Sequence, residues 1–397
     1  MVKDFKILIG ITGSVSAYKM YTVIRQLKQI KAEIRVIITP AAKNFISPTL
    51  LTTFSEHQVY CDFVENDQWQ NHVLLGRWAN LFLIAPVSCN TIAKMANGIS
   101  DNFLLATYLS CNSPVLVIPA MDEDMWNHPS TQRNIKLLQS FGNQIIEPKE
   151  GLLASGLTGK GRLPEPDEIV TYIKDKYLRT IELKGRTVLV TAGPTEEPID
   201  PVRVLTNRSS GKMGYAIAEA LYMAGAKVIL ISGPVSITPK YEGIQLIKVT
   251  TASEMFDACL QYQQNYDIGI FSAAVADYTV SAPSLQKIKK TNENLELTLV
   301  KTVDIIGSMG ANKEKHQKII GFALETENEN ENAKAKLQRK NADLIILNKL
   351  DEDNTCFNQD NMSVSFVDQE MIHPTISRTK ESIAQQLLSY ILKNWIE

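Results

Sequence analysis

Two turns rich in glycine and hydroxyl residues could each bind a phosphate group. The first is Gly10-Ile11-Thr12-Gly13-Ser14-Val15-Ser16, which lies between an apolar run and a segment of helical period. Its small residues leave backbone N–H groups and hydroxyls free at a helix N-terminus, which suits a phosphate. A tight turn whose Ser and Thr side chains only cap the helix is an equally good interpretation of this pattern.

The surroundings of the first turn favour a mononucleotide such as FMN over NAD. The spacing Gly-x-Thr-Gly is not the GxGxxG fingerprint, and no acidic residue closes the next strand, where Thr39-Pro40 stands instead. A polar loop, Ser88-Cys89-Asn90-Thr91, follows the third apolar run. Doubly wound folds bind ligands at the carboxyl ends of their strands, so we expect this loop to join the same site.

The second turn, Asn207-Arg208-Ser209-Ser210-Gly211-Lys212, opens a helix in the second half of the chain. A helix start rich in N–H donors and hydroxyls is a good triphosphate cradle. A capped helix in a dinucleotide-like fold is the alternative, but the prolines before the turn make an elaborate loop for a mere connection. We therefore interpret this turn as functional.

Charged residues further along could complete a nucleotide site. Ser272-Ala273-Ala274-Val275-Ala276-Asp277 closes a strand with a carboxylate that could hold a ribose or a metal. In Lys287-Ile288-Lys289-Lys290 the lysines could neutralise phosphate oxygens, although the last two are by default a solvated face. Lys336 and Lys340 lie four apart on one predicted helix face, as either a second phosphate clamp or a surface salt-bridge ladder.

These residues require strands that end at one edge of a sheet. Short β-rich runs alternate with longer helical segments, which predicts βαβ units on a parallel sheet. We expect strands over 6–11, 34–39, 81–86, 115–118 and 144–147, and then over 186–191, 227–232, 245–249, 268–272, 319–322 and 344–347. The predicted fold class is α/β, with two doubly wound, Rossmann-like domains of which the first is flavodoxin-like.

A charged amphipathic helix that begins at Asp167 leads into a polar stretch and Gly185, where we place the domain boundary. The predicted domains are residues 1–183, which would bind FMN, and residues 184–397, which would bind the second nucleotide. The acidic tract 325–332 runs directly into a basic segment, so we interpret it as an acidic helix start rather than low complexity.

The composition excludes several classes of function. The 397 residues carry 41 Lys and Arg against 43 Asp and Glu, so no broad basic field exists for nucleic acid or anionic lipid. No apolar run approaches the ~20 residues that cross a bilayer. Residues 5–11 look like a first strand rather than a signal sequence, so we expect a cytoplasmic protein. Five scattered cysteines without a CxxC pair argue against a disulfide framework or a Cys-rich zinc site.

The Ser88–Thr91 loop and the string Pro-Ala-Met-Asp-Glu-Asp-Met-Trp at 119–126 together resemble the flavin-dependent cysteine decarboxylases. That family includes phosphopantothenoylcysteine decarboxylase and the lantibiotic-modifying decarboxylases. The resemblance implies that FMN accepts a hydride from the substrate's cysteine side chain and that the resulting thioaldehyde loses CO2 to give an ene-thiol. It implies a histidine base, matched here by His72, although a lone His near an apolar helix face is more often structural. The FMN contacts expected on this basis are Gly13, Ser14, Ser16, Thr39, Ser88, Cys89, Asn90 and Thr91.

Two residues depart from the family pattern. Asp122 stands where the family has Asn, and an ionised carboxylate only accepts hydrogen bonds and would repel the substrate's own carboxylate. Ser155 stands where the family's flap has a Cys that donates a proton as the ene-thiol is reduced, and serine should donate poorly. The first domain could therefore complete the decarboxylation slowly, stop at the oxidised ene-thiol, act on another cysteine-like acid, or serve as a flavin-binding scaffold.

The second half resembles phosphopantothenate–cysteine ligase almost end to end, through residues 191–195, 200–203, 207–214, 273–278 and 287–290. A flavin half followed by a ligase half matches the bacterial bifunctional enzyme of coenzyme A synthesis. The resemblance implies that CTP activates the phosphopantothenate carboxylate as an acyl-cytidylate, which the cysteine amine then attacks. Asn207 would orient the acyl intermediate, and Lys287 would help to hold CTP. The other CTP contacts implied are Ser272, Ala273, Asp277, Asp304, Ile305, Ile306, Phe322, Lys336 and Lys340.

The catalytic candidates are thus His72, Asp122, Ser155, Asn207 and Lys287. We expect Mg2+ to accompany CTP, because phosphoryl oxygens carry charge that must be offset. No isolated metal-ligand cluster is visible in the sequence, which suits a metal held mainly by the nucleotide and leaves its protein ligands unknown. The resemblance also implies trimers of flavin halves and dimers of ligase halves, which together would build a homododecamer.

Overall fold

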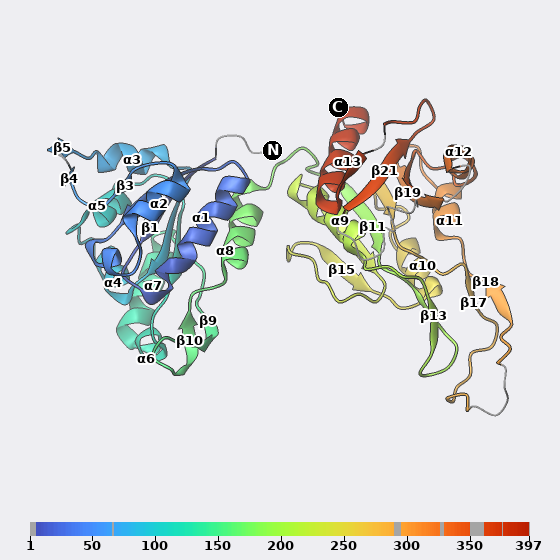
Figure 1. Ribbon diagram of the computed structural model, residues 1–397, viewed down its shortest axis with the longest axis horizontal. Helices are drawn as coiled ribbons and strands as arrows, with labels where there is room; N and C mark the ends of the chain where they lie inside the picture. Colours follow the sequence, from blue (N-terminus) through green and yellow to red (C-terminus); the bar gives the residue numbers. More distant parts are fainter. Residues whose placement is uncertain are drawn as a thin grey trace. The chain divides into compact units, whose positions relative to one another are not determined.

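Two compact units make up the chain, one over Met1–Leu178 and the other over Arg179–Glu397. Figure 1 shows that each unit has a central sheet covered by helices. The computed structural model describes residues 5–65, 67–289, 295–325, 329–349, 361–374 and 376–396.

The first unit contains a sheet of six parallel strands in the order β3-β2-β1-β6-β7-β8. These strands are β1 (Lys6–Ile11), β2 (Glu33–Ile38), β3 (Val59–Tyr60), β6 (Leu81–Val87), β7 (Val115–Pro119) and β8 (Gln144–Ile145). The chain builds outward from β1 through β2 on one side and later through β6 on the other. Because ligands of open α/β sheets bind where the strand order reverses, the carboxyl ends of β1 and β6 are the expected site.

Helices cover both faces of this sheet because its strands bury side chains on both sides. In β1, Ile7 and Ile9 pack into one hydrophobic cluster while Leu8 packs into the other. One face is covered by α1 (Lys19–Gln29), α2 (Pro48–Ser55) and α8 (Pro166–Ile173). The other is covered by α3 (His72–Trp78), α4 (Cys89–Ala96), α5 (Phe103–Leu109), α6 (Glu123–Asn127) and α7 (Pro129–Ser140).

The second unit contains an eight-stranded sheet in the order β15-β14-β11-β16-β19-β20-β21-β22. The strands from β15 to β20 are parallel, and the last two pair antiparallel. They are β11 (Thr187–Ala192), β14 (Lys227–Ser232), β15 (Gln245–Lys248), β16 (Ile268–Phe271), β19 (Lys318–Glu325), β20 (Leu344–Lys349), β21 (Asn361–Val367) and β22 (Ile376–Thr379).

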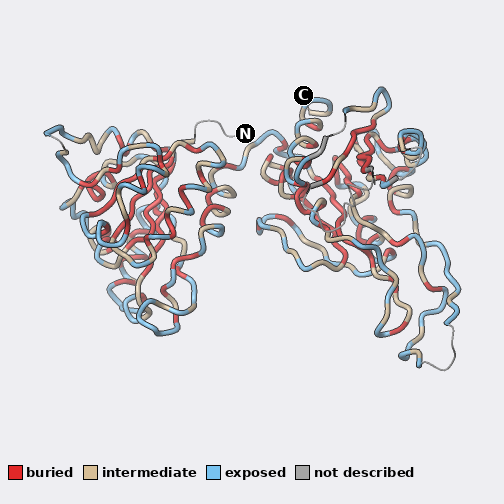
Figure 2. The backbone as a smooth tube through the Cα atoms, in the orientation of Figure 1, coloured by how far each residue is buried: buried red, intermediate tan, exposed pale blue. Residues whose placement is uncertain are grey.

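One face of the second sheet packs against α9 (Lys212–Met223) and α13 (Lys380–Trp395). The other face packs against α10 (Ala252–Leu260), α11 (Ile305–Ala311) and α12 (Glu329–Arg339). Figure 2 shows the buried residues concentrated along the central strands of each unit. The carboxyl ends of β11, β16, β19 and β20 therefore meet at one edge.

Short antiparallel pairs project from both sheets. They are β4 (Val64–Glu65) with β5 (Gln68–Trp69), β9 (Lys149–Leu152) with β10 (Thr158–Arg162), β12 (Glu196–Pro198) with β13 (Val204–Thr206), and β17 (Tyr278–Val280) with β18 (Leu299–Lys301).

The predicted α/β class with two doubly wound sheets is confirmed, and every expected parallel strand is present within a few residues of its expected ends. The antiparallel pairs, β3, β21 and β22 were not predicted. The expected helix at Asp167 ends at Ile173 and continues as a π-helical turn over Lys174–Leu178. The acidic tract does open a helix, α12, although residues 326–328 of it lie outside the described part of the chain. No helix in the described ranges is long and apolar enough to span a membrane.

A half-buried polar cluster joins α13 to the end of β21. Asp368 Oδ2 accepts a hydrogen bond from the Tyr390 hydroxyl at 2.8 Å and lies 2.8 Å from His373 Nε2. Its Oδ1 accepts from the N–H groups of Glu370 and Met371. Burial alone would raise the pKa of Asp368, but these hydrogen bonds outweigh burial and lower the pKa to about 2.

Replacing Asp368 with Asn should therefore destabilise the second unit. The free energy of unfolding at pH 7 should fall by about 1–3 kcal/mol, as for other hydrogen bonds to a charged group. Because the folded pKa lies below the ordinary value of 3.8, this stabilisation is present above about pH 4 and is lost as the pH falls towards 2. Urea unfolding at pH 7 and pH 2.5 checks both statements, with Glu370→Gln as an exposed control. An equal deficit at both pH values would contradict the assignment.

Candidate functional site

The loop after β1 is tied directly to the loop after β6. Thr12 Oγ1 donates to the Pro86 carbonyl oxygen at 2.9 Å and accepts from the Ser88 N–H at 2.8 Å. This pair of bonds brings the Gly13-Ser14 turn beside the Ser88 loop. Ser14 does not cap the following helical turn with its side chain; its Oγ lies 3.0 Å from Ser16 Oγ. The helix-capping alternative therefore fails for the Ser14 side chain, whose hydroxyl has Ser16 as its one partner among the described residues.

Thr39 lies at the carboxyl end of β2, next to the same turn. Its N–H donates to the Ile11 carbonyl oxygen at 3.0 Å. Its side-chain hydroxyl is buried and has no hydrogen-bond partner in the described chain. A buried hydroxyl without a partner is costly, so this atom indicates a place where a polar ligand group would be bound.

The Ser88–Thr91 loop begins α4. Ser88 Oγ accepts from the Thr91 N–H at 3.4 Å, so Ser88 is the helix cap. Cys89 Sγ lies 3.2 Å from Thr131 Oγ1, Asn90 is exposed, and Thr91 is buried. The eight predicted FMN contacts thus fall on three loops at the carboxyl ends of β1, β2 and β6, which are adjacent in the sheet.

His72 is the first residue of α3, and its ring is surrounded by aromatic side chains. The ring centroids of Phe63, Trp69 and Phe103 lie 5.8, 6.2 and 6.2 Å from it in edge-on arrangements. Nδ1 of His72 is buried without a hydrogen-bond partner in the described residues. No described contact joins His72 to the three loops, so its predicted role as a base stays a prediction.

Asp122 and Ser155 lie on elements that contact each other. Asp122 precedes α6 without capping it through its side chain, and Ser155 lies in the exposed turn between β9 and β10. The Met121 N–H donates to the Gly161 carbonyl oxygen, and the Lys160 N–H donates to Glu123 Oε1 at 3.4 Å. A Cβ at Gly161 would lie 2.0 Å from the Met121 carbonyl oxygen, so only glycine allows the hairpin to pack this closely on the segment before α6.

A cavity of about 810 Å³ opens at the carboxyl edge of the second sheet. Its walls come from the Asn207–Gly214 segment, the ends of β16, β19 and β20, the β17–β18 pair, and α11 and α12. Of the predicted ligase residues, those that line it are Asn207, Ser272, Ala273, Asp277, Asp304, Ile305, Ile306, Phe322, Lys336 and Lys340. The structure does not place Lys287 on the cavity wall; it is exposed on the segment between β17 and β18.

The start of α9 packs closely on the sheet at this cavity. A Cβ at Gly214 would lie 2.6 Å from Ser272 Oγ and 2.6 Å from Ala192 Cβ, which leaves no room for a side chain. Ser272 Oγ donates to the Thr191 carbonyl oxygen at 2.6 Å. Asn207 Nδ2 donates to the carbonyl oxygens of Ala274 and Val275 at 3.2 and 3.0 Å. Because both bonds use its nitrogen, the carbonyl oxygen of Asn207 is the atom left for a ligand.

Lysines from α12 reach the opposite wall. Lys336 Nζ donates to the Phe322 carbonyl oxygen at 2.7 Å, and Lys340, just beyond the helix, pairs with Asp304. Burial alone would raise the pKa of Asp304, but hydrogen bonds from Lys340 and from the Gly307 N–H lower it below its ordinary value. Both lysines therefore contact groups at the cavity wall, as the phosphate-clamp interpretation requires.

Several residues on the cavity wall were not singled out from the sequence. Five are cations: Arg208, Lys212, Lys301, Arg339 and Lys380. Arg208 and Lys212 lie inside the predicted turn, so their positions could have been anticipated. Asn348, at the end of β20, gave no sequence signal. Its Oδ1 is buried without a hydrogen-bond partner in the described chain and so is a further acceptor for a ligand.

Fold and site together define a two-domain α/β protein with a hydroxyl-rich turn at the sheet edge of one unit and a cation-lined cavity at the sheet edge of the other. Residues 1–178 match the flavoprotein family model, and residues 183–394 match that of the DNA/pantothenate metabolism flavoprotein C-terminal domain.

Full-length relatives agree with these matches. The coenzyme A biosynthesis bifunctional protein CoaBC of Bacillus subtilis is 41% identical and covers 91% of this chain and 89% of its own. The CoaBC protein of Escherichia coli K12 is 37% identical and covers 99% of this chain and 98% of its own. A cysteine/cysteine sulfinic acid decarboxylase from an unknown prokaryote is 45% identical over 87% of this chain and 99% of its own. The chain belongs to the CoaBC family of bifunctional coenzyme A biosynthesis enzymes.

Replacing Asn207 with Asp should disrupt the cavity wall. The variant places a carboxylate oxygen against two carbonyl oxygens at about the present 3.0–3.2 Å, where an N–H donor is now. We expect a loss of about 1–3 kcal/mol in unfolding free energy and a tenfold or greater loss of nucleotide affinity. Urea unfolding and calorimetric CTP titration measure the two effects. Asn265→Asp, at an exposed side chain, controls for the added charge; equal behaviour of the two variants would contradict this role.

Proposed function

We propose that the second unit is a CTP-dependent ligase that joins phosphopantothenate to cysteine. The carboxylate of phosphopantothenate attacks the α-phosphorus of CTP, and diphosphate leaves. The amine of cysteine then attacks the acyl carbon of the acyl-cytidylate, the bond from that carbon to the phosphate oxygen breaks, and CMP is released with the amide. The cavity at the carboxyl edge of the second sheet is the observation that carries this proposal.

The charge of the cavity suits a triphosphate. Two acidic residues, Asp277 and Asp304, face a much larger set of cations on its wall: Arg208, Lys212, Lys301, Lys336, Arg339, Lys340 and Lys380. Cations of this kind offset the charge of phosphoryl oxygens and of the leaving diphosphate. The N-terminus of α9 adds backbone N–H groups and the positive end of a helix dipole.

Mg2+ would enter this site with the nucleotide. Among the described residues, no group of three or more His, Cys, Asp or Glu side chains could hold a metal ion. We propose that the phosphate oxygens supply most of the metal ligands, as is usual for magnesium nucleotides.

Asn207 would orient the attacking amine in the second step of the reaction. Its nitrogen is held by the Ala274 and Val275 carbonyl oxygens, so its free carbonyl oxygen can accept a hydrogen bond from the attacking amine. An acceptor at this position would hold the amine beside the acyl carbon, which is how a positioned group lowers the barrier.

We propose FMN as the cofactor of the first unit, held by the loops after β1, β2 and β6. The unpaired Thr39 hydroxyl and the Ser14–Ser16 pair fit a phosphate-bearing flavin. When bound, FMN would supply the hydride acceptor for oxidation of a cysteine side chain, after which CO2 is lost. His72 would serve as the base, and the β9–β10 hairpin would cover the substrate and exclude water.

A second candidate keeps this chemistry but changes the substrate of the first unit to a free cysteine-like acid. The carboxylate of Asp122 does not cap α6 and could pair with the ammonium group that a free amino acid carries and an acylated cysteine lacks. The relative whose name gives cysteine and cysteine sulfinic acid as substrates supports this candidate.

One assay separates these functions. With phosphopantothenate, cysteine, CTP and Mg2+, we expect diphosphate, CO2 and a saturated thiol product, detected by its mass. Diphosphate without CO2 would leave the first unit as a scaffold, and CO2 released from cysteine in the absence of CTP would favour the free amino acid. No diphosphate would contradict the ligase proposal.

The two departures from the family pattern predict how the first unit can be improved. If Ser155 donates a proton poorly, a fraction of the product should be the ene-thiol, which has two hydrogens fewer than the saturated thiol. Ser155→Cys should then raise the saturated fraction, and Asp122→Asn should raise the rate with phosphopantothenoylcysteine. Mass spectrometry of the product measures the first and CO2 release the second; no change in either variant would contradict these roles.

The buried Thr39 hydroxyl, which has no hydrogen-bond partner in the described chain, predicts opposite effects of its removal on FMN affinity and on the stability of the apoprotein. Thr39→Val keeps the shape but removes the hydroxyl, so FMN affinity should fall about 5- to 20-fold while the apoprotein is equally or more stable. Flavin fluorescence titration and thermal unfolding of the apoprotein measure these effects. Thr53→Val, whose hydroxyl bonds within α2, is the control; unchanged FMN affinity in Thr39→Val would contradict the assignment.

We retain the homododecamer and the cytoplasmic location as proposals. Light scattering of the purified protein measures the assembly, and a smaller stable oligomer would contradict it.

A further inference from the structure

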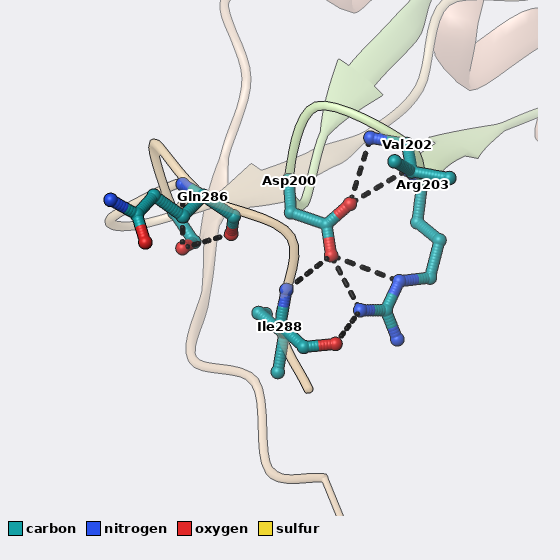
Figure 3. A network of polar contacts seen from close by, with 6 residues as sticks. Asp200, Val202, Arg203, Gln286 and Ile288 are labelled. Atoms are coloured by element: carbon teal, nitrogen blue, oxygen red, sulfur yellow. Dashed lines mark hydrogen bonds and ion pairs between the residues drawn. The ribbon is translucent and has the colours of Figure 1, made fainter. Parts of the chain in front are cut away.

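An ion pair between buried Asp200 and half-buried Arg203 lies in the turn between β12 and β13, outside the cavity. Figure 3 shows Asp200 with both carboxylate oxygens occupied. Oδ1 accepts from the N–H groups of Val202 and Arg203 at 2.8 and 2.9 Å. Oδ2 accepts from Nε and Nη2 of Arg203, at 2.9 and 2.5 Å. The side chain of Asp200 is 0% exposed, so this charge is fully removed from water.

The same pair holds the backbone of Ile288, which is 88 residues away in the sequence. The Ile288 N–H donates to Asp200 Oδ2 at 3.2 Å, and Arg203 Nη2 donates to the Ile288 carbonyl oxygen at 2.7 Å. Both backbone groups of one residue are therefore bound by one ion pair (Figure 3). The flanking side chains of Lys287 and Lys289 are exposed, whereas Ile288 is half-buried.

Few other contacts fix this segment. It belongs to the excursion between β17 and β18, and residues 290–294 lie outside the described chain. Between residues 282 and 289, the described hydrogen bonds to other parts of the protein all go to residues 199–203. Besides the two bonds of Ile288, there is one from the Ser284 N–H to the Ile199 carbonyl oxygen at 3.0 Å.

The ion pair is stably charged. Burial alone would raise the pKa of Asp200, but the N–H groups and the Arg203 guanidinium outweigh burial and hold the pKa at about 2. A buried charge that loses its partner is strongly destabilising, so separating Arg203 from Asp200 is costly. Such satisfied polar networks fix a single local arrangement.

We propose that Asp200 and Arg203 are positioning residues of the ligase reaction, which hold the Ile288 backbone so that Lys287 is presented to the bound nucleotide. This inference rests on the proposed ligase function and on the CTP contact that the family resemblance implies for Lys287. The segment that carries Lys287 is bonded to residues 199–203 at Ser284 and Ile288, so the hold on Ile288 sets the position of the adjacent Lys287.

A double-mutant cycle tests whether Asp200 acts through Lys287. Asp200→Asn places an amide against the Arg203 guanidinium and the Ile288 N–H, so the segment should be released. We expect the rate of CTP-dependent diphosphate release to fall about 10- to 100-fold, with a raised KM for CTP. In the Lys287→Ala background, the same substitution should change the rate less than twofold. Arg203→Lys, which keeps the charge but loses the planar fork, should behave like a weaker Asp200→Asn.

A structural ion pair elsewhere is the matched control. Arg186 and Asp267 join β11 and β16 at the amino edge of the sheet, where Asp267 also accepts from the Thr187 N–H. Asp267→Asn should lower thermal stability without any coupling to Lys287→Ala. Trypsin cleavage after Lys287 and Lys289 should become faster in Asp200→Asn and in Arg203→Lys but not in Asp267→Asn, which reports segment release independently of activity.

The outcomes separate the inference from the function on which it rests. If the wild-type protein releases no diphosphate, the proposed function fails. If it does, and the effects of Asp200→Asn and Lys287→Ala multiply as independent losses, the positioning role is overturned. Should Asp200→Asn not fold, the same cycle is run with Arg203→Lys. In that case the positioning role is overturned if the effects of Arg203→Lys and Lys287→Ala on the rate multiply and trypsin cleavage is unchanged.

Discussion

The close approach of α9 to the ends of β11 and β16 is the constraint on which the ligase site depends. Gly214 allows it, because any Cβ would collide with Ser272 and Ala192. The contact places the helix N-terminus and the Asn207–Gly211 turn directly over the sheet edge. Lysines of α12 reach the same space from the other face. Helices from both faces thus bring positive groups to one cavity that no single element could form.

The parts of the fold that could be predicted are those in which local pattern and burial agree. Strand β11 is a run of buried residues bounded by turns, so both its type and its position could be predicted. The projecting pairs were not, since β12 reads Glu-Glu-Pro and β18 is exposed throughout. Motif residues such as Asn207 could be placed at the site, but Asn348 could not, because one polar residue at a strand end is ordinary. The hold of Asp200 on Ile288 depends on a contact between distant loops, which no local pattern contains.

The two units differ in the elements that form their proposed binding sites. The first has short loops with small hydroxyl residues and a hairpin packed beside α6 through Gly161. The second has projecting strand pairs and many cations on its cavity wall, which suit the negatively charged substrates proposed for it. The departures at Asp122 and Ser155 concern the proposed chemistry of the first unit, whereas the polar residues proposed to hold FMN all lie on the loops after β1, β2 and β6.

The central claim is that the phosphopantothenate carboxylate bonds to the α-phosphorus of CTP. Phosphopantothenate labelled with oxygen-18 in its carboxylate tests this directly when it is supplied with cysteine, CTP and Mg2+. Because the oxygen between carbon and phosphorus stays with phosphorus when the amine attacks, we expect one labelled oxygen in CMP by mass spectrometry. Label in orthophosphate, or CMP without label, would contradict the account.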